Sequence, residues 1–260
     1  MEPMDPNIKQ AVKDLSSPLA ERREDALTVI LAHPEEATPD LLLILEKVKN
    51  VPVGAGVTLN DWSWFLAAYL LAQFRDKQAK TILLEQFSLP GEHVERLFKD
   101  ILVEDLPRIL ATLCAEDPSA LRELIENPAV HESVKASALW GYTLLATIGA
   151  VDPSEVTVYY AQMFQGKAPR RASYLWTSLV AGAAALHALS LKRDILKAYE
   201  EGLLDASAYS MKEVLAEWES TPEESLKRLA EDSGGLIKDV WEEMEYWPWT
   251  EEAGREASED

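Results

Sequence analysis

Cysteine and long apolar runs are scarce in this sequence. Cys114 is the one cysteine among 260 residues, so a disulfide framework and a cysteine-rich zinc site are excluded. No segment comes near the roughly 20 uncharged apolar residues that span a bilayer. The first residues, MEPMDPNIKQ, lack the basic region and apolar core of a secretory signal. We therefore expect a cytoplasmic protein that does not enter a membrane.

Basic residues are also few, with 25 Lys and Arg against 45 Asp and Glu and a net charge of −20. Direct binding to nucleic acid is disfavoured, because Lys and Arg must replace the counterions of the phosphates. The segment Lys192–Asp260 alone holds 20 acidic and 8 basic residues, and from Trp247 onward it resembles an acidic tail. A basic protein partner, a cation or solubility alone would fit this charge.

Strand patterns are almost absent, and signals for helix starts recur instead. Six residue pairs place a side chain that can cap a helix directly before a proline suited to the first helical position. Helical spacing of apolar residues follows most of these pairs. They are Asp5-Pro6, Ser17-Pro18, Thr38-Pro39, Asp117-Pro118, Asp152-Pro153 and Thr221-Pro222. The sequence therefore predicts an all-α chain.

Helix pairs recur at a spacing of about 35–45 residues, which is typical of α-solenoids. The clearest hairpin runs from Trp62 to Pro90, and Pro107 fits the first turn of a helix that restarts with Asp105 as its cap. We expect a HEAT-like α-solenoid of antiparallel helical hairpins that forms a right-handed superhelix. The expected parts are N-terminal helices and a loop (1–57), the repeat core (58–205), acidic helices (206–246) and an acidic, flexible tail (247–260).

Three segments, Tyr69–Ala79, Phe87–Glu92 and Asp100–Ala111, resemble DUF1186, an uncharacterised bacterial family of unknown function. The resemblance extends over roughly residues 40 to 215. It implies a HEAT-like helical fold and no established activity. Some members of that family carry a C-terminal SEC-C motif, a small cysteine-rich zinc module. This chain has no cysteine after Cys114 and therefore lacks that motif.

The densest charged cluster consists of Asp100, Glu104, Asp105 and Arg108. Carboxylates spaced four residues apart could hold a cation or act as an acid and base pair. The same residues could instead cap a helix, favour its positive end and pair with one another. The cluster could also contact a basic partner. The four histidines show no zinc-ligand spacing, so we expect no metal and no cofactor.

Aromatic residues recur near predicted helix starts and faces. Stacked repeats could bring several of them to one concave surface, where Trp and Tyr commonly dominate binding. Core packing between repeats is the alternative, because large aromatic side chains supply much of a protein's buried area. Trp62 and Trp64 cannot both face inward on one regular helix.

These observations favour a non-catalytic scaffold for protein–protein interaction, with a protein partner and no enzymatic activity. The predicted partner-binding residues are Trp62, Trp64, Tyr69, Asp100, Glu104, Asp105, Arg108, Trp140, Tyr142 and Trp176. One alternative is a metal-dependent or hydrolytic enzyme that uses the Asp100–Arg108 cluster. A second alternative is an acidic nucleic-acid mimic that binds a basic protein.

Overall fold

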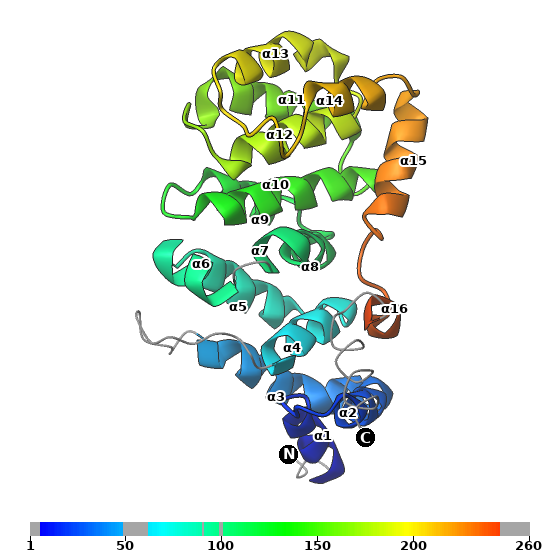
Figure 1. Cartoon of the computed structure of the whole chain (residues 1–260). Helices are drawn as coiled ribbons and strands as arrows, with labels where there is room; N and C mark the ends of the chain where they lie inside the picture. Colours follow the sequence, from blue (N-terminus) through cyan, green and yellow to red (C-terminus); the bar gives the residue numbers. More distant parts are fainter. Residues whose placement is uncertain (1–5, 49–61, 90, 99–100, 245–260) are drawn as a thin grey trace, which may run out of the picture. The chain divides into compact units, whose positions relative to one another are not determined.

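The computed structural model describes residues 6–48, 62–89, 91–98 and 101–244. Across these ranges the chain is helical and contains no β-strand, which confirms the predicted all-α class (Figure 1). None of the described helices has both the length and the apolar character needed to cross a bilayer. The expected tail at 247–260 and the loop before Trp62 lie outside the described residues.

The helices form two compact units. The first unit takes in the described residues up to Gln86 together with those from Ile237 onward. Its helices are α1 (Pro6–Asp14), α2 (Ala20–Ala32), α3 (Pro34–Lys47), α4 (Trp62–Gln73), most of α5 (Lys77–Phe87) and α16 (Val240–Met244).

The core of the first unit centres on α4. Every residue from Ser63 to Ala72 except Phe65 is buried, and a helix that is apolar all round must be enclosed by other elements. Helices α3 and α16 pack against it. The Val240 backbone N–H donates a hydrogen bond to Gln73 Oε1 at 2.8 Å, which fixes the start of α16 on the end of α4.

The second unit covers Phe87–Leu236. It holds α6 (Gly91–Phe98), α7 (Ile101–Glu104), α8 (Leu106–Cys114), α9 (Ser119–Glu126), α10 (Glu132–Thr147), α11 (Pro153–Gln162), α12 (Tyr174–Ala185), α13 (Lys192–Glu200), α14 (Met211–Glu217) and α15 (Pro222–Asp232). A π-helical turn, η2 (Met163–Lys167), follows α11, and a 3₁₀ turn, η3 (Leu189–Leu191), precedes α13.

Helix α10 is the centre of the second unit. It packs against α7, α8, α9, α11, α12 and α15, and Figure 1 shows it as the long green helix between α9 and α12. From Val134 to Ala146, every residue except Lys135 and Trp140 is buried. Gly141 allows α8 to approach closely, because an added Cβ atom would lie 2.9 Å from the Pro107 carbonyl oxygen.

Two of the six predicted helix starts are confirmed in full. Asp152 accepts a hydrogen bond from the Ser154 backbone N–H at the start of α11. Thr221 and Glu224 form a reciprocal capping box at the start of α15. The predicted break before Pro107 is also confirmed, with Asp105 at the N-cap position of α8, although its side chain makes no capping hydrogen bond.

Three of the predicted starts are corrected by the structure. Thr38-Pro39 lies inside α3, where Thr38 Oγ1 donates to the Pro34 carbonyl at 2.8 Å. A proline inside a helix lowers its stability by about 3 kcal/mol. Burial of the apolar face of α3, which includes Ala37 and Leu41, offsets that loss. Helix α2 begins at Ala20 after the pair Ser17-Pro18, and α9 begins at Ser119 after Asp117-Pro118. Asp5 lies outside the described residues, and α1 begins at Pro6.

Replacing Gly141 with Ala tests the close contact between α8 and α10. We expect the unfolding free energy to fall, because overpacking against a backbone carbonyl costs about 1–3 kcal/mol. The better helix propensity of Ala returns only about 1 kcal/mol. Urea unfolding should show a lower midpoint, and Glu200→Ala on the exposed face of α13 should leave the midpoint unchanged. A midpoint at or above that of the wild type would contradict the packing.

Candidate functional site

Four of the predicted surface aromatics lie in the core. Trp64 and Tyr69 are each 2% exposed in the first unit, and Tyr142 and Trp176 are 1% and 0% exposed in the second. Trp176 Nε1 donates a hydrogen bond to the Pro169 carbonyl at 2.8 Å. Side chains enclosed in this way cannot contact a partner on this surface, so their assignment to the binding face is corrected to core packing.

Trp62 and Trp140 are the predicted aromatics that stay partly exposed. Trp62 packs edge-on against Phe65 at 5.6 Å between ring centroids, and the Arg23 guanidinium lies 5.4 Å from the centroid of its ring. The expected division between Trp62 and Trp64 is therefore confirmed, with Trp64 inside and Trp62 at the surface. Trp140 projects from α10 in the second unit and lines a groove described below.

The structure describes three of the four residues in the predicted charged cluster. Asp100 lies outside the described residues, Glu104 is exposed, and Asp105 is half-buried at the start of α8. Arg108 extends to the loop after α15, where Nε donates to the Gly235 carbonyl at 3.0 Å and Nη2 to the Gly234 carbonyl at 3.2 Å. Arg108 therefore ties α8 to the end of α15.

Among the described residues, no three His, Cys, Asp or Glu side chains gather where they could hold a metal ion. Cys114 is buried in the core, as expected for an inert thiol.

Two cavities of about 350 and 250 Å³ adjoin in the second unit, because both are lined by Trp140, Ala181 and Tyr209. We call them together the Trp140 groove. The larger cavity is also lined by Val103, Pro107, Ala136, Ser137, Tyr174, Thr177, Ser178 and Ala208. The smaller cavity is also lined by Ala185, Glu217, Ser225, Arg228, Leu229, Asp232 and Ser233.

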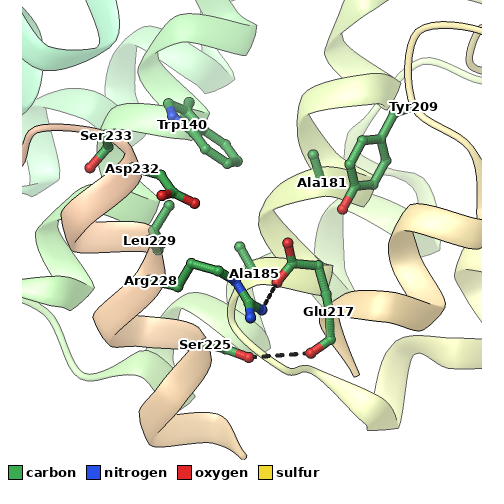
Figure 2. A pocket seen from close by; sticks show the side chains of 10 residues that line it. All are labelled: Trp140, Ala181, Ala185, Tyr209, Glu217, Ser225, Arg228, Leu229, Asp232 and Ser233. Atoms are coloured by element: carbon green, nitrogen blue, oxygen red, sulfur yellow. Dashed lines mark hydrogen bonds and ion pairs between the residues drawn. The ribbon is translucent and has the colours of Figure 1, made fainter. Parts of the chain in front are cut away.

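Local helix geometry explains the shape of the groove. Tyr174, Ser178, Ala181 and Ala185 lie three or four residues apart on α12, so they share one face of that helix. Most of these side chains are small and leave space above the helix. Trp140 from α10 and Tyr209 from the segment before α14 stand on either side of that space (Figure 2). Tyr174, which is 41% exposed, adds an aromatic edge.

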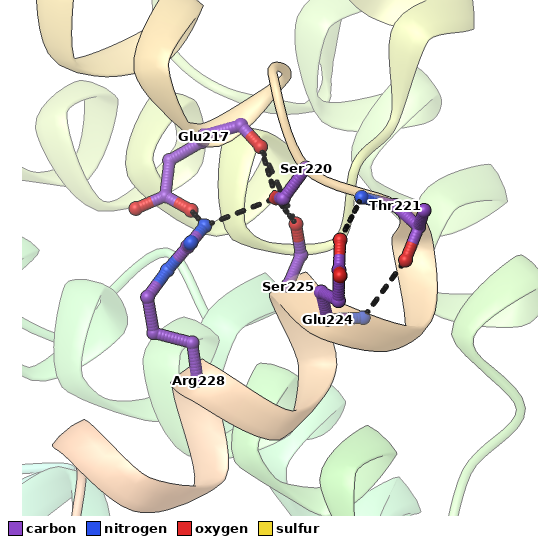
Figure 3. Close-up of polar contacts among 6 residues, drawn as sticks. All are labelled: Glu217, Ser220, Thr221, Glu224, Ser225 and Arg228. Atoms are coloured by element: carbon purple, nitrogen blue, oxygen red, sulfur yellow. Dashed lines mark hydrogen bonds and ion pairs between the residues drawn. The ribbon is translucent and has the colours of Figure 1, made fainter.

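Helix α15 closes the smaller cavity from the other side, as Figure 2 shows. Arg228 pairs with Glu217 across the turn between α14 and α15. Ser220 Oγ donates to the Glu217 carbonyl at 2.8 Å, and the hydroxyls of Ser220 and the buried Ser225 lie 2.8 Å apart (Figure 3). This network holds α14 and α15 together beside the groove.

Capping boxes fix the start of each of these two helices. Ser210 and Glu213 form the first box, at α14, and Thr221 and Glu224 form the second, at α15 (Figure 3). In the second box the Thr221 backbone N–H donates to Glu224 Oε2 at 2.8 Å, and the Glu224 backbone N–H donates to Thr221 Oγ1 at 3.2 Å. Each helix therefore begins at a defined residue, which sets where its side chains meet the groove.

The groove is acidic at its edge. Its lining contains two carboxylates, Glu217 and Asp232, and one cation, Arg228, which pairs with Glu217. From Ser210 to Ser233 the chain has seven acidic and three basic residues. Burial raises the pKa of Tyr209, and the negative charge of Glu217 raises it further. The Tyr209 hydroxyl therefore stays protonated at neutral pH and can donate a hydrogen bond.

The sequence identified Trp140 as a site residue but missed Tyr209, Arg228 and Asp232. The signal for the helix that carries two of them was present, because Thr221 followed by Glu224 three residues later is a capping box. The packing of α15 against α10 is a contact between distant segments. Nothing in the local pattern indicates it.

A family model described as "Protein of unknown function (DUF1186)" matches residues 7–251, and the chain belongs to this family. An uncharacterised protein of Chlamydia muridarum (strain MoPn / Nigg) is 33% identical over 224 residues, which cover 86% of this chain and 89% of that protein. An uncharacterised protein of Chlamydia trachomatis serovar D is 32% identical, covering 86% and 88%. No solved structure matches the chain.

The capping box of α15 makes a pH-dependent prediction. The Thr221 backbone N–H, followed by the Thr221 side chain, lowers the pKa of Glu224 from its ordinary value of 4.5. Because the folded-state pKa is depressed, the stabilisation is present above pH 4.5 and is lost as pH falls through the folded-state pKa. The chemical shift of the Thr221 amide proton should titrate with a midpoint below 4.5.

Glu224→Gln should abolish this titration while it keeps the helix start, because Gln serves equally well at this position of a capping box. A midpoint at or above 4.5 in the wild type would contradict the box.

Proposed function

We propose that this protein is a non-catalytic binding scaffold of the cytoplasm, built from HEAT-like helical repeats. Packing in the second unit supports the repeat assignment. Most of its helix contacts join neighbours along the chain, as α8 packs with α9 and α10, and α10 with α11 and α12. Repeat proteins show this contact pattern because each helical pair buries its apolar face against the next.

We infer that the Trp140 groove is the binding surface. The observation that supports this inference is an open hollow, which Trp140, Tyr174 and Tyr209 line above a face of small side chains. Trp and Tyr are enriched in residues that dominate binding energy, because they bury a large area and keep a polar edge. Grooves between helices commonly take an amphipathic helix of a partner, which inserts its apolar side chains.

The negative charge around the groove favours a partner with positive charge. The acidic segment Ser210–Ser233 borders the hollow, and Asp232 lies in its lining. A partner helix with Lys or Arg beside its apolar stripe would gain from this field, whereas an acidic helix would be repelled. We therefore propose a basic, amphipathic protein segment as the occupant of the groove.

A pair of synthetic peptides tests this function. Both peptides carry Leu at helical spacing, one with Lys and the other with Glu at the remaining positions, and fluorescence anisotropy reports binding. We expect the Leu/Lys peptide to bind and the Leu/Glu peptide to bind at least tenfold more weakly. Trp140→Ala should weaken the Leu/Lys peptide about 30-fold, since truncation of a central aromatic typically costs 2 kcal/mol or more.

Two further variants keep the test decisive. Ala181→Leu fills the groove from α12 and should also weaken binding. Trp241→Ala removes a partly exposed Trp of the first unit and should leave the affinity unchanged. Equal binding of the two peptides, or equal affinity of wild type and both groove variants, would show that the groove is not the binding surface.

A further inference from the structure

A third cavity of the second unit, about 380 Å³ in volume, is lined by three cations: Lys135, Lys167 and Arg171. The gathering of cations is unexpected in a chain of net charge −20. Two carboxylates, Glu126 and Glu132, line the same cavity, so the lining carries one surplus positive charge. We call this hollow the Lys135 cavity.

Two of the three cations already have carboxylate partners. Lys167 Nζ lies 3.0 Å from Glu126 Oε1. Arg171 Nη2 and Nε lie 2.6 and 2.8 Å from Glu132 Oε1. Lys135 forms no ion pair and no side-chain hydrogen bond with any described residue. The one positive charge of the lining that no carboxylate pairs with is therefore the Lys135 ammonium.

The surroundings of Lys135 favour an added negative charge. Burial lowers the pKa of Lys135, the negative charge of Glu132 opposes that shift, and the positive charge of Arg171 lowers the pKa further. A half-buried ammonium with a guanidinium nearby is destabilised unless an anion offsets its charge. An anionic group in the cavity would pair with the Lys135 ammonium and favour its charged form.

Local structure fixes the opposite wall of the cavity. The π-helical turn η2 ends at Lys167, directly after Gly166, whose φ of 132° is a conformation that favours glycine. The Pro169 carbonyl then accepts a hydrogen bond from Trp176 Nε1, which anchors the segment to α12. A glycine of positive φ commonly ends a helix, and here Gly166 lies at the end of the helical run of α11 and η2. The turn places Lys167 beside Glu126 at the end of α9, and the segment after it places Arg171 beside Glu132 at the start of α10.

The rest of the lining is apolar and includes Ile125, Met163 and Leu175. A cavity of this size falls within the range of small-molecule sites, about 300–1,000 Å³, where a few charged groups orient an otherwise apolar ligand. We propose that Lys135, with Arg171 and Lys167, binds the head group of a small organic anion whose apolar body packs on Pro128 and Pro169, the exposed apolar residues of the lining. A carboxylate and a phosphate monoester share this chemistry.

Isothermal titration calorimetry on the full chain tests the proposal with four probes. The two anions, 3-phenylpropionate and phenyl phosphate, separate a carboxylate head group from a phosphate. The neutral 3-phenylpropanol reports the apolar contribution, and inorganic phosphate reports the head group without a body. We expect at least one of the two aromatic anions to bind, at least tenfold more tightly than either the alcohol or inorganic phosphate.

Lys135→Met removes the charge and keeps most of the side-chain volume. It should weaken the bound anion at least tenfold. Lys212→Met makes the same change in net charge at an exposed position of α14 and should leave the affinity unchanged. Circular dichroism confirms that both variants are folded.

Three results would overturn the proposal: no heat from either aromatic anion at millimolar concentration, equal binding of the alcohol, or the same affinity in Lys135→Met as in the wild type.

Discussion

The burial of α10 is the constraint on which the second unit depends. An apolar helix that is covered on nearly every side must be matched closely by its neighbours, because protein interiors are packed without voids. Gly141 meets the Pro107 carbonyl closely, and Gly182 of α12 would place an added Cβ 3.0 Å from Thr143 Oγ1. Small residues at these contacts let α8 and α12 approach α10 from different sides.

Buried hydrogen bonds then fix the rotation of α10 about its axis. Ser137 Oγ donates to the Leu102 carbonyl of α7, and the hydroxyls of Thr143 and Tyr160 bond to each other. Tyr160 also donates to the Leu139 carbonyl at 3.2 Å. A buried hydroxyl without its partner is costly, so these contacts favour one rotation over others.

That rotation decides where the two partly exposed side chains between Val134 and Ala146 point. Lys135 and Trp140 are five residues apart, which is about 140° around the helix axis. Each therefore meets a different gap between the surrounding helices, and each lines a different cavity. The proposed protein-binding groove and the proposed anion site are thus consequences of the same packed helix.

The parts of the fold that follow local rules were predictable from the sequence. The all-α class, the caps at Asp152 and Thr221 and the break before Pro107 each depend on a few neighbouring residues. Thr38-Pro39 shows the limit of such rules, because the packing of α3 overrides the cost of an interior proline.

Burial of individual aromatics was not predictable in the same way. Trp140 and Tyr142 lie two positions apart on α10, yet the first lines a groove and the second is enclosed. The neighbours that decide this come from α11, α12 and α15, which are separate helices beyond α10 in the chain. The sequence around Lys135 does not indicate a binding site, because the cavity that Lys135 lines depends on the distant turn at Met163–Lys167.

Amide hydrogen exchange of the native protein tests the central role of α10 most directly. Helices that open only with the whole unit exchange with the free energy of global unfolding, whereas peripheral helices open locally. We predict that the amides of Leu139, Leu144 and Leu145 exchange most slowly in the second unit, and that those of α14 and α15 exchange earlier. Exchange of these α10 amides at the same rate as α15, or faster, would contradict it.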